Sequence, residues 1–229
     1  MSGQTAAAAL AAVVAAACTA VCASRLRAAR RRAPLIAWTI GFGLFTAAAG
    51  ALWYGAAEGW TQAPFRIYYL TGGVLVVAYL AVGELLLVLP GRRVTRMATA
   101  TMLFLTFAAA AAVLAARVDA GDLRRAGATP PNNALVGPWP KVMAILLNSV
   151  GTVVLLAGSL RSAWGRRDPR PLMVAAGVGV IAAASTATRL GSYTLFAAAQ
   201  AVGTVLILLG LVTRRGGPAA ARPTSSAGS

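Results

Sequence analysis

Seven long apolar stretches occupy most of this chain of 229 residues, and arginines gather in alternate connections between them. Stretches of about 17 to 25 residues are long enough, as helices, to cross the hydrocarbon core of a bilayer. Because the stretches are continuous rather than alternating, and lipid-embedded backbone must be hydrogen-bonded internally, we expect helices. The sequence therefore predicts an all-α polytopic membrane protein, a bundle of seven transmembrane helices. Their approximate bounds are 6–23, 35–54, 65–89, 97–116, 142–160, 171–188 and 193–212.

The distribution of Lys and Arg predicts the orientation of this bundle. If the connection after residue 23 is cytoplasmic, that side of the membrane holds 15 of the 21 basic residues. The positive-inside rule then places the N-terminus outside and the C-terminus in the cytoplasm of a multi-pass protein of the plasma (inner) membrane. Within this map, residues 1–213 form the transmembrane domain, 117–140 an extracytoplasmic loop and 214–229 a disordered cytoplasmic tail.

A net charge of +16 could also indicate a nucleic-acid-binding protein. The basic residues, however, lie in short clusters at the ends of apolar stretches rather than along one polar face. We therefore expect membrane lipids as partners, including anionic headgroups at the inner face, and no nucleic acid.

Residues that commonly carry chemistry are scarce. The chain has no histidine, which excludes imidazole metal ligands and Ser-His or Cys-His couples. Lys141 is its one lysine, so a retinal Schiff base in the last helix is excluded as well. Cys18 and Cys22 share a helical face, where packing is favoured over a redox or metal pair. We expect no metal site and no cofactor, and enzymatic activity is disfavoured.

One phrase recurs in stretches that run in the same direction. It reads NSVGTVVLLAG from Asn148, QAVGTVLILLG from Gln200 and, partially, AVGELLLVL from Ala81. Asn148 with Thr152, and Gln200 with Thr204, form polar pairs one helical turn apart. Small and hydroxyl residues of this kind serve helix packing, or they line a polar pocket where these stretches converge.

Glu84 takes the place of the threonine in the third copy, and it is the one acid inside an apolar stretch. A carboxylate at membrane depth costs at least about 2.5 kcal/mol unless it is paired, hydrated or protonated. Glu84 is therefore either a proton site, a cation site or an anchor for a cationic ligand, or it reaches inner water or pairs with Arg92 or Arg93.

Polar residues from several segments meet the outer boundary in this map. They form an anion-holding mouth, or they are interfacial anchors and ion pairs with Glu58, Asp119 or Asp122. The residues assigned to the mouth are Glu58, Arg66, Tyr69 and Lys141, with Arg189 beside them.

Three segments, FRIYYLTGG at 65–73, LLNSVGT at 146–152 and TRLGS at 188–192, resemble a group of uncharacterised seven-helix membrane proteins from high-GC actinobacteria. The resemblance covers most of the chain from residue 35 onward. It implies the fold and a membrane location but no activity. It also implies a neutral residue, often threonine, at position 84, so the carboxylate of Glu84 is not a function shared by that group.

Two functions are compatible with these features. The first is binding or transport of a small lipophilic molecule between the stretches 65–89, 142–160, 171–188 and 193–212. The second is a non-catalytic membrane scaffold or a subunit of a larger complex. The ligand-binding residues expected under the first hypothesis are Glu84, Asn148, Thr152, Arg189, Gln200 and Thr204.

Overall fold

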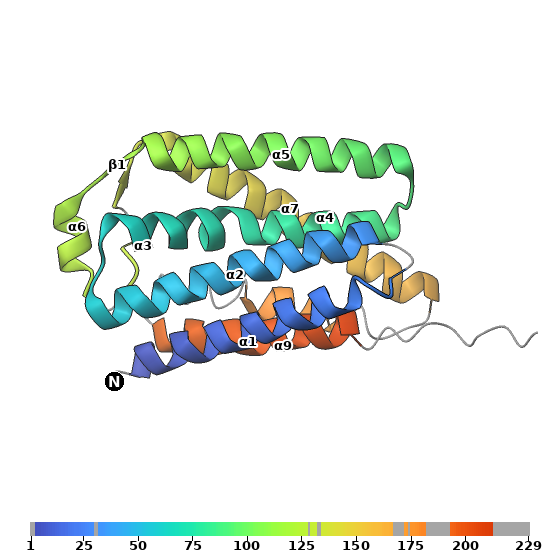
Figure 1. Ribbon diagram of the computed structural model, residues 1–229, viewed down its shortest axis with the longest axis horizontal. Helices are drawn as coiled ribbons and strands as arrows, with labels where there is room; N and C mark the ends of the chain where they lie inside the picture. The colour runs from blue at the N-terminus through green and yellow to red at the C-terminus, as the bar shows by residue number, and fades with distance from the viewer. Residues whose placement is uncertain are drawn as a thin grey trace, which may run out of the picture.

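Long helices, nearly parallel to one another, make up most of the structure, a computed structural model (Figure 1). It describes residues 3–29, 32–127, 129–131, 134–166, 172–173, 175–181 and 193–212. The helices are α1 (Gly3–Arg25), α2 (Arg32–Glu58), α3 (Gln62–Ile67), the π-helix η1 (Tyr68–Leu75), α4 (Val76–Val88), α5 (Arg92–Ala115), α6 (Ala120–Arg125), α7 (Pro138–Arg166) and α9 (Tyr193–Val212); residues 172–173 and 175–181 are also helical.

Five of the described helical segments are long and apolar enough to cross a membrane. They are α1, α2, the continuous unit formed by α3, η1 and α4, α5, and α7. A shorter apolar helix, Ala198–Gly210, lies within α9. The predicted all-α character is confirmed, and the five segments coincide with the first five predicted stretches. The stretch 171–188 lies partly outside the described residues.

The helices extend beyond the apolar stretches that predicted them. α5 begins at Arg92 rather than near residue 97, and α7 spans Pro138–Arg166 rather than 142–160. Arginine is a good helix former, so a helix continues where its apolar stretch has ended. Pro138 and Pro140 fall in the first turn of α7, where a missing backbone N–H costs no intrahelical bond.

α4 lies at the centre of the packing, between α2 and α7. α1 packs against α2 and α9, and α5 packs against η1 and α7. The largest apolar cluster joins α1, α2, α4, α7 and α9 and includes Trp38, Phe42, Leu80, Leu155 and Ile207. The indole N–H of Trp38 donates to the carbonyl of Leu80 at 3.2 Å, which satisfies this buried donor and ties α2 to α4.

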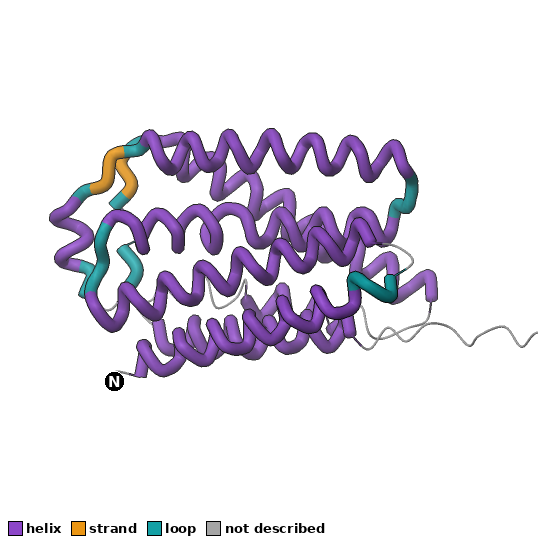
Figure 2. The backbone as a smooth tube through the Cα atoms, viewed as in Figure 1, coloured by secondary structure: helices purple, strands orange, loops and turns teal. Residues whose placement is uncertain are grey.

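The connection between α5 and α7 contains secondary structure, whereas the sequence predicts only an extracytoplasmic loop over 117–140. Strands β1 (Arg117–Val118) and β2 (Leu135–Val136) pair antiparallel, and α6 lies between them in the chain (Figure 2). Asp119 caps α6 by accepting from the backbone N–H of Gly121 at 2.6 Å. The spacing of Asp119 and Asp122 is a cap signal that could have predicted this helix.

The connections lie at two opposite ends of the bundle. The turn after α1 and the link between α4 and α5 are at one end, whereas the α2–α3 link, α6 and the strands are at the other (Figure 2). Arg25 and Arg27 belong to the first end, as do Arg92, Arg93 and Arg96. We call it the arginine-rich end.

Candidate functional site

Glu84 lies in α4 one turn before the helix ends, and its side chain is 1% exposed. It faces α7, where the hydroxyl of Ser162 donates to its Oε1 across 3.5 Å. Gly158 leaves room for it, because a Cβ at that position would lie 2.6 Å from the Cγ of Glu84. The carboxyl group is therefore packed between two helices and does not reach bulk water at the arginine-rich end.

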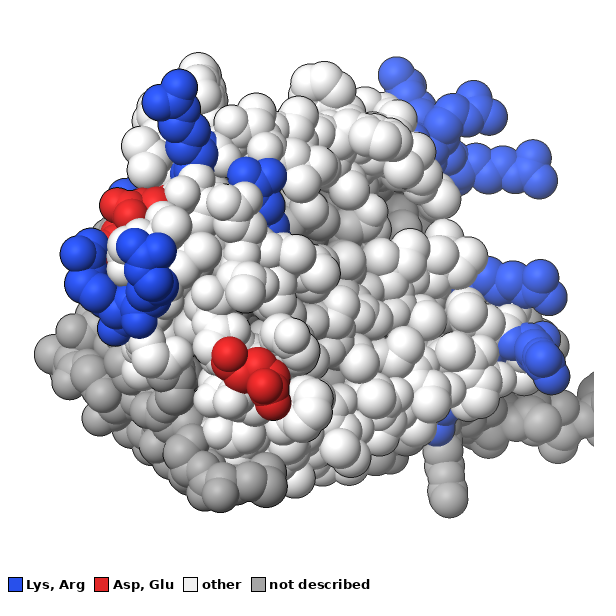
Figure 3. All heavy atoms as spheres, turned by 60° about the vertical axis from the view of Figure 1, so that its left-hand side comes forward, with Lys and Arg blue, Asp and Glu red and all other residues white. Residues whose placement is uncertain are grey.

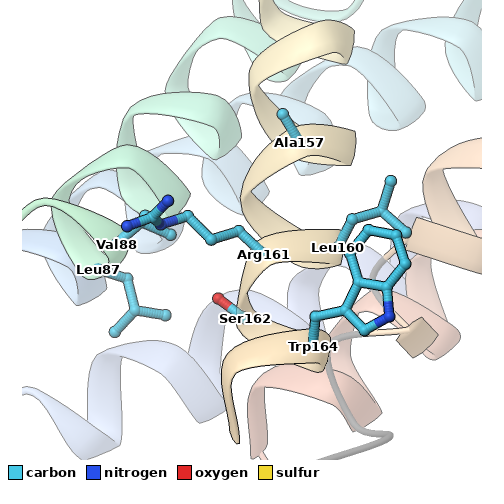
Figure 4. Close-up of a pocket in the computed structure, with 7 residues that line it drawn as sticks. All are labelled: Leu87, Val88, Ala157, Leu160, Arg161, Ser162 and Trp164. Atoms are coloured by element: carbon cyan, nitrogen blue, oxygen red, sulfur yellow. The ribbon is translucent and has the colours of Figure 1, made fainter.

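An open cleft of about 780 Å³ lies beside this contact, between the end of α4 and the last turns of α7 (Figure 4). Arg161 extends across it toward α4, while Trp164 lies on the other side of α7 and is 87% exposed. Ser162 belongs both to the cleft and to the contact with Glu84. The lining residues are Leu87, Val88, Ala157, Leu160, Arg161, Ser162 and Trp164.

Sequence reasoning did not single out Gly158, Arg161 or Ser162 as site residues. Their placement opposite Glu84 depends on the register between two helices 70 to 80 residues apart in the chain. The one local signal is the spacing of four between Gly158 and Ser162, which puts both on the same face of α7.

Asn148 uses its amide to bind backbone carbonyls. Its Nδ2 donates to the carbonyl of Gly73 in η1 at 2.6 Å and to that of Ala144 at 2.8 Å. A π-helix disturbs the regular pairing of backbone groups where it joins an α-helix. Asn148 thus satisfies a carbonyl of η1 and fixes α7 against it.

The predicted ligand-binding residues do not all come together. Asn148 precedes Gly158 by ten residues, so it lies about 15 Å along α7 from the contact with Glu84. Thr204 is 1% exposed and donates to the carbonyl of Gln200 in its own helix at 2.7 Å. Thr152 and Gln200 are half-buried, and Arg189 lies outside the described residues.

The glycine that directly follows valine in each copy of the repeated phrase lies at a helix crossing. Gly83 adjoins the ring of Trp38. A Cβ on Gly151 would lie 2.9 Å from the side chain of Val77, and one on Gly203 would lie 2.6 Å from that of Ile181. This common role favours packing as the reason for the repeated phrase.

In the proposed outer mouth, Arg66 forms hydrogen bonds to backbone carbonyls. Arg66 donates from Nη1 to the carbonyl of Leu114 at 2.7 Å and from Nη2 to that of Ala116 at 2.9 Å. These carbonyls belong to the C-terminal end of α5, where a cation is favoured by the helix dipole. Glu58 and Lys141 are exposed and Tyr69 is half-buried against Phe65.

The two aspartates of this end, Asp119 and Asp122, form their side-chain hydrogen bonds within α6. Asp119 caps α6, and Asp122 accepts a hydrogen bond from Arg125 in the same helix. This hydrogen bond raises the pKa of the Arg125 guanidinium above its ordinary value. Among the described residues, the side-chain hydrogen bonds of Arg66 therefore go to the end of α5, and those of Asp119 and Asp122 stay within α6.

Two further features bear on chemistry. Cys18 and Cys22 are free thiols, 0% and 2% exposed, and both belong to the largest apolar cluster. Within the described part of the chain, no group of three His, Cys, Asp or Glu side chains is placed to hold a metal ion.

The chain matches no protein-family model, and comparison with curated proteins and with solved structures finds no significant match.

Proposed function

We propose that this protein is a seven-helix membrane protein that binds or transports a small lipophilic molecule, with its N-terminus outside and its C-terminus in the cytoplasm. The five apolar helices of sufficient length support a membrane location. The helical residues 172–173 and 175–181, together with α9, are compatible with the remaining two segments of the proposal. The charge asymmetry supports the orientation, and the resemblance to the actinobacterial group is compatible with both.

The observation that carries the proposal is the cleft between α4 and α7. Its volume of about 780 Å³ falls within the range of roughly 300–1,000 Å³ typical of small-molecule sites. Leu87, Val88 and Leu160 give it an apolar wall, while Arg161 and Ser162 supply polar groups. A molecule with an apolar body and an acidic head fits this chemistry, because the guanidinium offers paired donors to a carboxylate or phosphate.

Ser162 gives the site a connection to the protein interior. Its hydroxyl reaches Glu84 at 3.5 Å while also lining the cleft. In the proposed function, an incoming acidic head competes for this hydroxyl. Ligand binding would then change the environment of a carboxyl group buried between α4 and α7.

Native mass spectrometry of the purified full-length protein tests the proposal, because a retained small molecule identifies its own chemical class. Ala157 is exposed in the cleft, so Ala157→Trp should fill it and abolish retention, and Arg161→Gln should weaken retention of an acidic molecule. Val153→Trp is the matched control, since Val153 lies one turn away on α7, is 65% exposed and does not line the cleft. Equal retention by all three variants would refute the proposal.

The scaffold is the second candidate, and a specific observation favours it. The side chains of Asn148 and Thr204 donate hydrogen bonds to backbone carbonyls, and the repeated glycines lie at helix crossings. These residues build the bundle rather than a ligand site. If the wild-type protein retains no small molecule from membranes or from added fatty acids, the scaffold becomes the better description.

A further inference from the structure

A second cleft opens at the arginine-rich end, on the other side of α4. Its volume is about 740 Å³. The first turn of α2, the end of α4 at Leu86, the Pro90–Gly91 link and the start of α5 enclose it. This second cleft shares no lining residue with the α4–α7 cleft, so binding here is independent of the function proposed above. An inference about the second cleft rests only on the part of that proposal that places the helices in a bilayer.

The charge of this cleft has one sign. Arg92 and Arg96 line it from α5, both exposed and one helical turn apart. Like charges at this spacing repel each other, and the first turn of α5 contains no acid. No Asp or Glu belongs to the described lining. On the face drawn in Figure 3, acidic and basic side chains occur together toward the α6 end, whereas the charged side chains that project from the opposite end are basic. A concave site with this field attracts anions.

The helix beyond the cleft distinguishes a lipid from a soluble anion. Leu103 and Phe107 lie seven and eleven residues after Arg96, so the three share one face of α5. Leu103 is 51% and Phe107 is 74% exposed. The distance from Arg96 to Phe107 along the helix is about 16 Å, close to half of a hydrocarbon core of roughly 30 Å. On this face of α5, the arginine is thus followed by exposed apolar side chains over a length that matches the hydrocarbon depth of one leaflet.

We propose that the cleft between α2, α4 and α5 is a specific site for an anionic phospholipid. The lipid phosphate sits between Arg92 and Arg96, with the hydroxyl-bearing Thr95 also in the lining. One acyl chain runs along Leu103 and Phe107. The second wall, with Pro34 and Leu86, contacts the apolar part of the headgroup region.

The test uses the full-length protein in detergent, exchanged with phosphatidylglycerol and phosphatidylcholine of identical chains, and counts bound lipid by native mass spectrometry. We expect preferential retention of phosphatidylglycerol. Arg92→Gln with Arg96→Gln should weaken it roughly thirtyfold, because each arginine near an anionic lipid surface contributes about a factor of five.

The matched control removes the same charge from the same end. Arg27 and Arg93 are exposed and do not line the cleft, so Arg27→Gln with Arg93→Gln should leave retention within about twofold of the wild type. Equal loss in both double variants would overturn the proposal in favour of a diffuse positive surface. Arg92→Lys with Arg96→Lys keeps the charge and should restore most of the binding.

Two further arms separate a lipid from a soluble phosphate compound. Inorganic phosphate at millimolar concentration should not displace phosphatidylglycerol, and Leu103→Ser with Phe107→Ser should weaken long-chain lipid more than a short-chain analogue. Displacement by phosphate together with no effect of the serine variants would overturn the lipid assignment. An altered α4–α7 cleft, as in Ala157→Trp, should leave this lipid preference unchanged, so the two proposals fail separately.

Discussion

Glu84 and Gly158 show how one missing side chain makes a buried carboxyl group possible. The Glu84 side chain is 1% exposed and occupies the space that a Cβ on residue 158 would need. A larger residue at 158 would push α7 away from α4 or force the carboxyl group out of its contact with Ser162. The free-energy cost of burying this carboxyl group therefore depends on how closely α4 and α7 approach each other, because the hydrogen bond from Ser162 is formed across that contact.

Replacing Gly158 by alanine should therefore destabilise the protein. Because the added Cβ would lie 2.6 Å from the Cγ of Glu84, we expect Gly158→Ala to cost about 1–3 kcal/mol, the usual range for overpacking. Thermal unfolding in detergent, followed by fluorescence-detected size exclusion, measures the change. Gly50→Ala is the control: nothing lies within 4 Å of its Cβ, so better helix propensity should leave it unchanged or more stable by about 1 kcal/mol. A more stable Gly158→Ala protein would contradict the proposed contact.

Arg66 illustrates a residue whose type, but not whose partner, follows from the sequence. Its position at a membrane boundary predicts an anchor or an anion site. The structure gives its two terminal nitrogens to carbonyls at the end of α5, Leu114 and Ala116. Such a fork can satisfy two unpaired carbonyls at once, which a lysine cannot do with the same geometry. The partner depends on how α3 approaches α5, and no local pattern contains that information.

At the scale of elements, η1 determines the register of the third membrane-length segment. The unit Gln62–Val88 begins as α3, continues as a π-helix over Tyr68–Leu75 and ends as α4. A π-helix turns less per residue than an α-helix, so it rotates the faces of α3 and α4 relative to each other. As a result Phe65 faces the apolar cluster that contains Trp60 and Leu123, Arg66 faces α5, and Glu84 faces α7.

Asn148 should stabilise this arrangement through its bond to Gly73. We expect Asn148→Leu to lower the unfolding free energy by about 1 kcal/mol, since interhelical hydrogen bonds in membranes average about 0.6 and reach about 1.7 kcal/mol. The loss should appear as a lower melting temperature in detergent. Gln200→Leu is the matched change in the other copy of the phrase and should be nearly neutral for stability. Loss of a bound small molecule in Asn148→Leu, without loss of stability, would instead assign Asn148 to a ligand site.

Hydropathy predicted the described membrane-length helices because burial in lipid acts on every residue of a span, and the signal adds over about 20 positions. It could not predict η1, because Tyr68–Leu75 is as apolar in a π-helix as in an α-helix. Nor could it place Gly158 and Ser162 beside Glu84, which requires the rotation that η1 introduces. α6 was predictable in principle from its aspartate cap, Asp119, but its segment carries no hydropathy signal.

On the scale of the whole molecule, both clefts lie at the arginine-rich end. The α4–α7 cleft contains Arg161 and the α2–α4–α5 cleft contains Arg92 and Arg96. The opposite end contains the β1–β2 pair, α6 and the aromatic contacts of Trp60 with Phe65 and Tyr68, and a smaller cleft of about 430 Å³ lies beside the strands and the start of α7. If the arginine-rich end is cytoplasmic, both proposed ligands enter from the inner leaflet or the cytoplasm.

The orientation is therefore the property on which access to both sites depends. Cys18 and Cys22 are buried, so the wild-type chain serves as a blank for labelling with a membrane-impermeant maleimide. Ser24 is exposed at the end of α1, and Val136 is 55% exposed in β2 at the opposite end. Because the positive-inside rule holds arginine-rich connections in the cytoplasm, Val136→Cys should be labelled on intact cells and Ser24→Cys only after lysis. Labelling of Ser24→Cys on intact cells would place both clefts at the outer leaflet and would require the ligands to arrive from outside.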